Sequence, residues 1–254
     1  MPFFKAAGKL VYYAHVPKCG GMSVASYLAE RFGPLAFHDR HYLSQPEATR
    51  WTRSSPQHVD AATLERLIPL ALFDACFSIV RHPVARIVSI YHFQQELEAS
   101  IPSALGFSDW LGLLEAGAPD DPFRYDNHTR PMSEIVPEGA AVFHMEHGLD
   151  TLIPWFDLLT GDAGGPRAIL PENTKGQYVT QRSDRIVPTA ADLARIARLY
   201  ATDFARFGYL PDRTAPISPA PQMTEAFVRG RNRALRQMNT PLARLRRKIR
   251  RRLR

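Results

Sequence analysis

The chain has 254 residues, of which 45% are hydrophobic and 22% are charged, and its formal net charge is +7. These values are typical of an ordinary soluble globular protein and allow one α/β domain with a sizeable buried core. Two cysteines make neither a disulfide framework nor a set of zinc ligands, which predicts a reducing compartment. No signal peptide and no membrane-spanning segment is predicted, so we expect a cytoplasmic protein.

The charge is unevenly distributed along the chain. Residues 224–254 contain 12 of the 32 basic residues and one of the 25 acidic residues, so this segment carries +11. Residues 1–223 keep 20 basic and 24 acidic residues, which is a net charge of −4. The basic character therefore belongs to the C-terminal segment and does not indicate a nucleic-acid-binding fold.

Apolar strands alternate with amphipathic helices along most of the chain, which predicts an α/β fold with a central parallel sheet flanked by helices. The strand patterns are nearly continuous in hydrophobicity, as expected for strands buried on both faces. Asp60 is expected to cap the second helix. We expect strands at 9–16, 73–80 and 140–145, and helices at 22–32, 60–67, 84–95, 149–160 and 190–207.

Composition divides the chain into three parts. Residues 1–210 are expected to form one domain. Residues 211–223 contain four prolines and predict a linker. Residues 224–254 predict a basic amphipathic helix or tail that suits an anionic membrane surface or glycan, with a disordered terminus as the alternative.

A glycine-containing loop follows the first predicted strand. Residues 15–23 have the sequence His-Val-Pro-Lys-Cys-Gly-Gly-Met-Ser, which we call the nucleotide loop. Glycines allow backbone N–H groups to approach an oxyanion, the following helix N-terminus adds partial positive charge, and Lys18 adds a full one. The lysine precedes the glycines, so the order differs from that of a nucleoside-triphosphate loop. A plain strand-to-helix turn with an exposed lysine remains the alternative.

A second basic element follows the second predicted strand. Arg81 closes that strand, and Ser89 lies eight residues further on, about two turns into the next helix. A guanidinium offers a fork of donors to phosphate oxygens, so the two side chains can converge on one phosphate. A surface arginine and an unrelated helix serine are the alternative.

Together the two elements resemble the sulfotransferases that use 3′-phosphoadenosine 5′-phosphosulfate (PAPS). The nucleotide loop is similar to that family's 5′-phosphosulfate loop, often His-Ile-Pro-Lys-Thr-Gly-Gly-Thr-Ser. Residues 77–91, Phe-Ser-Ile-Val-Arg-His-Pro-Val-Ala-Arg-Ile-Val-Ser-Ile-Tyr, are similar to its 3′-phosphate element. The carbohydrate branch, including heparan sulfate 2-O-sulfotransferase and bacterial relatives, is the most similar. Cys19 and Met22 depart from the family's usual threonine and hydroxyl residues.

The resemblance implies a single-domain, P-loop-like sulfotransferase fold and a role for each matching residue. Lys18 would contact the oxygen that bridges phosphate and sulfate. Arg81 and Ser89 would hold the 3′-phosphate. The backbone amides and the hydroxyl that would hold the 5′-phosphate belong to Gly20, Gly21, Met22 and Ser23. No metal is required by this chemistry.

Sulfuryl transfer needs a base for the acceptor hydroxyl, and imidazole titrates in a suitable range. His58 is the first choice, because a catalytic histidine of the 2-O-sulfotransferase-like enzymes stands at the start of the helix before the 3′-phosphate strand. His58 lies 23 residues before Arg81. His38 and His41 are the reserve candidates and expected acceptor-site residues, although their polar neighbours also suit an exposed loop.

Two further polar segments are expected to contribute. Residues 126–131, Asp-Asn-His-Thr-Arg-Pro, form a dense polar cluster without helix or strand periodicity, which we call the polar segment. Its members Asn127, His128 and Arg130 are expected to line the acceptor site. Residues 172–176 precede a loop where the family closes a flap over PAPS, which makes Asn173 and Lys175 weak nucleotide-binding candidates.

The sequence thus predicts a sulfotransferase with PAPS as co-substrate and a carbohydrate, glycolipid or small hydroxylated metabolite as acceptor. We expect the protein in the cytoplasm, or at the inner face of the membrane if residues 224–254 bind there. No nucleic-acid partner is expected. A small-molecule kinase is the runner-up, but it needs a Ser/Thr after the loop lysine and a Walker-B aspartate. A non-catalytic protein that binds anionic glycans through residues 224–254 is the third hypothesis.

Overall fold

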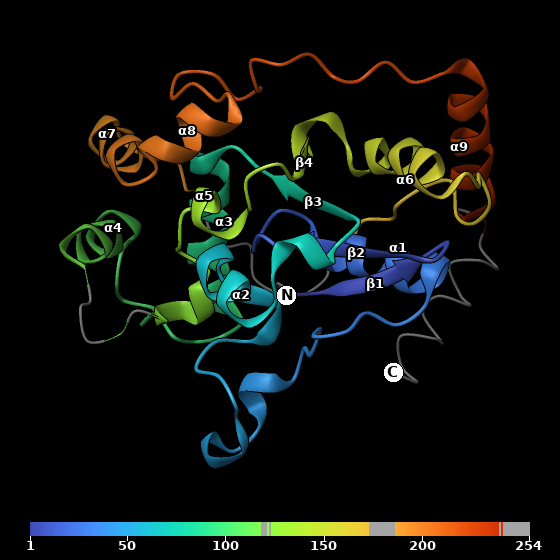
Figure 1. The fold of residues 1–254 in the computed structure, drawn as a ribbon. Coiled ribbons are helices and arrows are strands. Elements are labelled where there is room, and N and C mark those ends of the chain that lie inside the picture. Colours follow the sequence, from blue (N-terminus) through green and yellow to red (C-terminus); the bar gives the residue numbers. More distant parts are fainter. Residues whose placement is uncertain (118–120, 122, 173–185, 239, 241–254) are drawn as a thin grey trace.

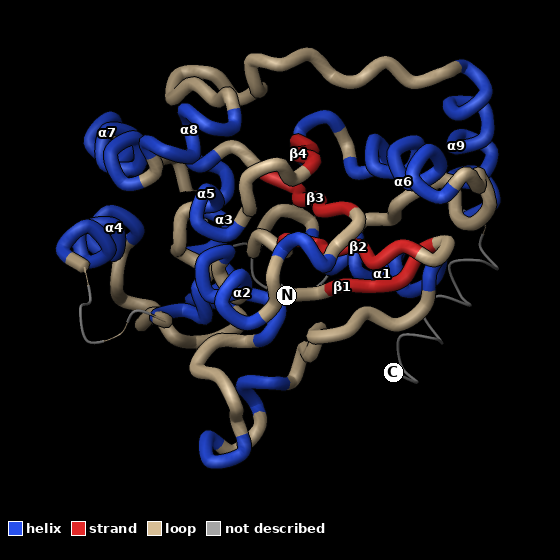
Figure 2. Tube along the Cα trace, viewed as in Figure 1, coloured by secondary structure: helices blue, strands red, loops and turns tan. Residues whose placement is uncertain are grey.

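The computed structural model describes residues 1–117, 121, 123–172, 186–238 and 240. A four-stranded sheet lies at its centre, in the order β1-β2-β3-β4 (Figure 1, Figure 2). The strands are β1 Phe3–Ala6, β2 Lys9–Ala14, β3 Ala75–Val80 and β4 Ala141–His144. Strands β2, β3 and β4 pair in parallel, and β1 pairs antiparallel with β2. The predicted α/β fold with a central, mostly parallel sheet flanked by helices is confirmed.

Strand β1 was not predicted, and it makes the sheet mixed. It has only four residues, of which Lys5 alone is polar, so its sequence shows little alternation between apolar and polar residues. Ala7 and Gly8 connect it to β2, both with positive φ values of 48° and 81°. Two consecutive residues with positive φ values make a tight turn whose twist matches that of a two-stranded hairpin.

Aromatic side chains fill the main core on one face of the sheet. Tyr13 of β2 and Phe77 of β3 stack with their ring centroids 4.8 Å apart. Phe77 in turn packs edge-on against Phe156 of α6 (Leu152–Thr160), 5.2 Å between centroids. Helix α1 (Gly21–Phe32) covers the same face, since its buried residues belong to the same cluster.

Helix α2 (Ala61–Leu67) packs near the opposite face, where Leu64 joins Tyr12 and Ala14 in a smaller apolar cluster. Asp60 caps this helix as predicted, because its carboxylate accepts a hydrogen bond of 2.9 Å from the Thr63 N–H. The sheet is therefore covered on both faces, as a parallel sheet requires.

The remaining helices surround this core. The helix predicted for residues 190–207 is two helices, because Tyr200 leaves the helical conformation (φ −118°, ψ 27°) and its hydroxyl donates to the Thr129 carbonyl. The helix α4 was not predicted. The helices are α3 Pro83–Glu96, α4 Phe107–Ala116, α5 Met132–Ile135, α7 Ala190–Leu199, α8 Ala201–Phe207 and α9 Glu225–Met238. Single 3-10 turns occupy Tyr42–Ser44, Glu47–Thr49, Pro56–His58, Leu70–Leu72, Arg124–Asn127, Met145–His147 and Leu149–Thr151.

Residues 211–223 contain no helix or strand and lead to α9, which lies beside α6 (Figure 1). Phe227 is the buried residue of α9, and its ring faces the Arg167 guanidinium at 5.0 Å. The predicted division of the chain at residue 210 stays a prediction. None of the helices within the described ranges combines the length and apolar character needed to cross a membrane.

Candidate functional site

The nucleotide loop leaves the end of β2 and ends in α1, as the sequence predicts. Lys18 and Gly20 adopt left-handed backbone conformations, with φ values of 65° and 81°. Gly20 is the N-cap residue of α1, and no side chain caps this helix within the described part of the chain. The first-turn amide N–H groups, including those of Gly21 and Met22, therefore remain available to an anion at a helix N-terminus.

Lys18 and Arg81 meet across the loop, although they are far apart in sequence. Arg81 follows the end of β3, and its Nη1 donates to the Lys18 carbonyl at 3.2 Å. The Lys18 ammonium lies 3.8 Å from the centroid of the Phe93 ring on α3. Ser89 is half-buried on α3, two turns beyond Arg81. The two predicted phosphate-binding elements thus lie against each other.

Arg86, which the sequence analysis did not single out, holds the nucleotide loop against the polar segment. Arg86 is 1% exposed. Its Nε donates to the Pro17 carbonyl at 3.2 Å, and its Nη2 donates to the carbonyls of His128 and Arg130 at 2.8 and 2.9 Å. Three carbonyls are thereby satisfied by one buried side chain, because guanidinium carries five donors in a planar fork.

His58 lies in a buried pair with Asp126. The His58 Nδ1 is 2.7 Å from the Asp126 Oδ2, and both side chains are 9% exposed. The Ser55 hydroxyl and amide also donate to this carboxylate, at 2.6 and 2.5 Å. Burial would raise the pKa of Asp126, but the His58 charge and these hydrogen bonds outweigh burial and lower it to about 2. A carboxylate at Nδ1 leaves Nε2 as the nitrogen that can accept a proton.

The polar segment is wound into a left-handed turn that holds His58. Tyr125, Asp126 and Asn127 have φ values of 56°, 53° and 60°. Left-handed conformations are costly for residues other than glycine, so surrounding contacts must hold them. The Asn127 amide donates to the His58 carbonyl at 2.9 Å, and Asp126 binds the His58 ring. Asn127 was expected at the acceptor site from the sequence, whereas no individual role was expected for Asp126.

Three further histidines surround His58. The His58 ring centroid lies 4.7 Å from that of His128 and 5.2 Å from that of His15, and His15 lies 6.3 Å from His38. Burial, with a contribution from His58, lowers the pKa of His128 to about 3. Burial, with a contribution from Arg40, lowers the pKa of His38 to about 4. These rings are therefore neutral at physiological pH and can donate or accept single hydrogen bonds.

The other predicted residues take different places. His41 is exposed and makes no ring contact with these histidines within the described residues. The Ser23 hydroxyl accepts a hydrogen bond of 2.8 Å from the Glu172 N–H, which leaves its own O–H free to donate. Asn173 and Lys175 lie outside the described residues.

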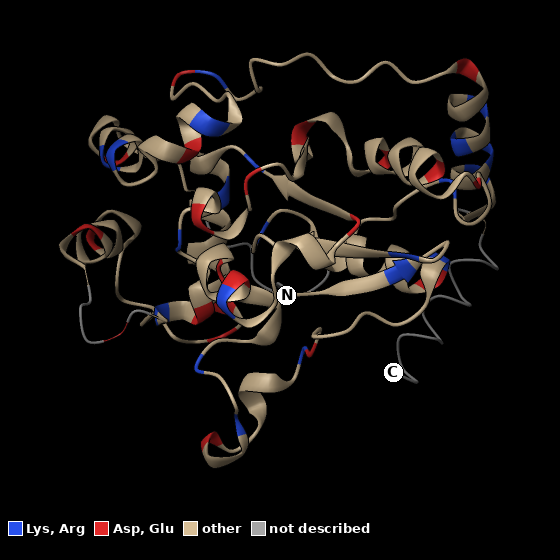
Figure 3. Cartoon of the chain, in the orientation of Figure 1, with Lys and Arg blue, Asp and Glu red and all other residues tan. Residues whose placement is uncertain are grey.

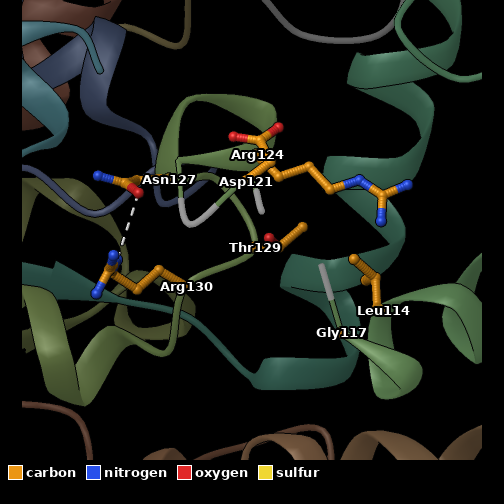
Figure 4. A pocket seen from close by; sticks show the side chains of 7 residues that line it. All are labelled: Leu114, Gly117, Asp121, Arg124, Asn127, Thr129 and Arg130. Atoms are coloured by element: carbon orange, nitrogen blue, oxygen red, sulfur yellow. Dashed lines mark hydrogen bonds between the residues drawn. The ribbon is translucent and has the colours of Figure 1, made fainter. Parts of the chain in front are cut away.

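A cavity of about 220 Å³ opens beside the polar segment (Figure 4). Asn127 and Arg130 both line it, and the Arg130 Nε donates to the Asn127 Oδ1 at 3.3 Å. Its volume is below the usual range of complete ligand pockets, so it suits one part of a larger molecule. The lining residues are Leu114, Gly117, Asp121, Arg124, Asn127, Thr129 and Arg130.

Three of the buried side chains could also hold a metal ion. Ligand atoms of His58, Asp126 and His128 lie within 4.8 Å of one another. However, both Asp126 oxygens already accept hydrogen bonds from Ser55, and Oδ2 also contacts the His58 ring. Hydrogen bonds from Ser55 and the contact with His58 therefore already engage both oxygens of this carboxylate.

The comparisons with known proteins identify a family for this chain. Neither the curated proteins nor the solved structures contain a match to this chain. The family model described as "Sulfotransferase family" matches residues 2–210, a range that includes the nucleotide loop, Arg81, the His58–Asp126 pair and the polar segment. The chain therefore belongs to the sulfotransferase family and is a transferase of sulfuryl groups.

Proposed function

We propose that this protein transfers the sulfuryl group of PAPS to a hydroxyl group of a carbohydrate or glycolipid, with His58 as the general base. The proposal rests on one observation. The nucleotide loop begins at His15, whose ring lies 5.2 Å from that of His58. An anion-binding loop and a histidine oriented by a carboxylate thus lie side by side, as an in-line displacement requires.

The nucleotide loop and α3 supply the binding groups for the donor. Lys18 neutralises charge on the phosphate that leaves, while the uncapped first turn of α1 and the Ser23 hydroxyl hold the 5′-phosphate. Arg81 and Ser89 hold the 3′-phosphate, and Asn173 and Lys175, outside the described residues, are proposed to contact the nucleotide. The contact between Arg81 and the Lys18 carbonyl supports this assignment, because it joins the two elements into one surface.

His58 removes the proton of the acceptor hydroxyl through Nε2. The acceptor oxygen then forms a bond to sulfur as the bond from sulfur to the phosphate oxygen breaks. Asp126 keeps the Nδ1 proton in place and stabilises the imidazolium that forms, since a negative charge beside Nδ1 favours the protonated ring. Lys18 stabilises the negative charge that accumulates on the departing oxygen.

Asn127, His128 and Arg130 are proposed to contact the acceptor, together with His38. The cavity lined by Asn127 and Arg130 supports this, because Asn127 also binds the His58 carbonyl. A contact between His41 and the acceptor has less support, because His41 is exposed on the surface.

The acceptor is proposed to lie at an anionic membrane surface. Basic residues recur along α9 (Figure 3), and Arg229, Arg233 and Arg236 are exposed. Arginines on one helix attract anionic headgroups by about 1 kcal/mol each near the surface. A glycolipid or lipid-linked sugar would then meet the site where the enzyme binds.

The test is transfer of labelled sulfate from PAPS into fractionated glycans and lipids of the host. Wild-type protein should label a fraction, and His58→Ala should label none while keeping its nucleotide affinity. The absence of label from every fraction with wild-type protein, despite measurable PAPS binding, would argue against a carbohydrate or glycolipid acceptor.

A metal held by His58, Asp126 and His128 would give a different result. The proposed base needs no metal, so dialysis against EDTA should leave the rate of labelling unchanged. A rate that falls with EDTA and returns with one divalent metal would assign these three side chains to a metal site instead.

A further inference from the structure

His15 is the first residue of the nucleotide loop, and its ring lies against the start of α1. The side chain is 7% exposed and stands between the Tyr13 and His58 rings, 5.2 Å from each centroid. A Cβ atom added to Gly21 would lie 1.7 Å from the His15 Nε2. Gly21 is the first residue of α1, so Nε2 is the ring atom that lies over the N-terminus of this helix.

The two nitrogens of His15 have different surroundings. Nδ1 is completely buried and has no hydrogen-bond partner in the described part of the chain. Nε2 also has no such partner there, but it is not among the completely buried atoms. Buried N–H groups without an acceptor are rarer in proteins than acceptors without a donor. The proton is therefore expected on Nε2, which makes this atom a hydrogen-bond donor.

The ring remains neutral in this position. Burial lowers the pKa of His15 well below its ordinary value, and the nearby His58 and His38 lower it further. A neutral ring with its proton on Nε2 cannot compete with His58 for the acceptor proton, because its free lone pair is on the enclosed Nδ1. His15 therefore suits a different task from that of His58.

We propose that the His15 Nε2–H donates a hydrogen bond to an oxygen of the sulfuryl group while that group is transferred. This assignment rests on the proposed function. The donor lies over the helix N-terminus proposed to hold the 5′-phosphate and beside the proposed base, which is where the sulfur must lie. A donor fixed by burial stabilises oxygen charge without reorganisation during the reaction.

Comparing two nucleotides tests the assignment without a known acceptor. PAPS contains the sulfuryl group, and 3′-phosphoadenosine 5′-phosphate (PAP) lacks it. His15→Phe keeps a ring of similar volume but removes both nitrogens, so it should weaken PAPS binding about tenfold and leave PAP binding within about twofold. Calorimetry with each nucleotide measures this ratio.

Two more variants identify the nitrogen. The Gln side-chain amide can stand near the position of Nε2, and the Asn amide near that of Nδ1. His15→Gln should therefore keep the preference for PAPS, and His15→Asn should lose it as His15→Phe does. A folded His15→Phe protein with an unchanged preference for PAPS, or rescue by Asn rather than by Gln, would overturn the assignment.

Nitrogen-15 NMR of the wild-type imidazoles provides a measurement that needs no variant. It should show the His15 proton on Nε2, and a proton on Nδ1 would overturn the proposal even if every variant fails to fold. Failure of the proposed function itself would give a different result. The wild-type protein would then bind neither PAPS nor PAP, whichever nitrogen of His15 carries the proton.

Discussion

The Asp126 Oδ2 lies 2.7 Å from the His58 Nδ1, although the two residues are 68 positions apart. The contact depends on the left-handed turn at residues 125–127, because this turn directs the carboxylate of the polar segment toward the 3-10 turn that ends in His58. The carboxylate fixes which nitrogen of His58 carries the proton. It thereby orients the ring and leaves Nε2 as the nitrogen that can accept a proton.

Replacing either member of the pair should reduce transfer much more than nucleotide binding. His58→Ala removes the proton acceptor, so the rate of transfer from PAPS should fall at least 10²-fold, with PAP affinity within about twofold. Asp126→Asn should also lower the rate, because an amide can stabilise the wrong tautomer. The measurements are kcat with the labelled acceptor fraction and calorimetry with PAP.

His41→Ala provides the control, since His41 is exposed and lies outside the histidine cluster. Its rate should equal that of the wild-type protein. Normal turnover by His58→Ala, or loss of turnover in His41→Ala, would assign the base to another histidine.

Arg86 should be needed for both stability and nucleotide binding. Its three carbonyl partners belong to two separate segments, and a lysine cannot reach all of them. Arg86→Lys should lower the free energy of unfolding by about 2–4 kcal/mol, because buried carbonyls lose their donors. It should also weaken PAP binding as the nucleotide loop loses its anchor.

Urea unfolding and calorimetry measure the two effects of Arg86→Lys. Arg66→Lys is the matched control, because Arg66 is exposed and hydrogen-bonds only to Thr63 at 3.4 Å within the described residues. Equal stability of the two variants would show that Arg86 does not hold the loop.

Gly21 should not tolerate a methyl group. In Gly21→Ala the new Cβ would collide with the His15 ring, so the ring or the start of α1 must move. We expect a loss of about 1–3 kcal/mol in stability, together with weaker PAP binding. Gly112→Ala is the control, because its Cβ would come no closer than 4.0 Å to the Arg195 Nη1 and lies within α4.

Alanine is a better helix former than glycine, so Gly112→Ala should be neutral or stabilise the protein by up to about 1 kcal/mol. Thermal unfolding of the two variants measures the difference. If Gly21→Ala unfolded at the wild-type temperature and bound PAP normally, the close packing of His15 on α1 would be unnecessary for the site.

The protein should lose stability as the pH falls below neutrality. The pKa values of His15 and His128 are lowered by burial, that of His128 from 6.5 to about 3, so the unfolded chain binds more protons than the folded one between those values. Each fully buried histidine should cost about 1–2 kcal/mol of stability between pH 6.5 and pH 5.

Asp126 adds to the acid sensitivity at lower pH. Its pKa is lowered from 3.8 to about 2, so its contribution is complete above pH 4 and disappears as the pH falls toward 2. Urea unfolding at pH 7.5, 6 and 5 tests the histidine part. Stability that stays constant over this range would mean that the buried histidines are already protonated or accessible in the folded protein.

The sequence allowed the sheet and the nucleotide loop to be predicted because their signals are local. Nearly continuous apolar runs at 9–16 and 73–80 indicate buried strands, and glycines after the first of them indicate a loop before a helix. Strand β1 was not predicted because four residues are too few to show an alternation of apolar and polar side chains. Its pairing also depends on the turn at Ala7 and Gly8.

The side chains that organise the site could not be predicted, because their partners are distant in sequence. Asp126 and Arg86 carry no local pattern that identifies the His58 ring or the three carbonyls as partners. His15 was read only as part of a motif, and no local pattern indicates the burial of its Nδ1 or the packing of its Nε2 on Gly21. A carboxylate is a common orienting partner of histidine, but the sequence does not indicate which histidine Asp126 meets.

Calorimetry with PAP and with adenosine 5′-phosphate tests whether this protein binds the PAPS nucleotide. These nucleotides differ only in the 3′-phosphate, which Arg81 and Ser89 are proposed to hold. We expect micromolar binding of PAP, at least tenfold weaker binding of adenosine 5′-phosphate, and loss of this difference in Arg81→Ala. Equal affinity of the wild-type protein for both nucleotides would contradict this expectation.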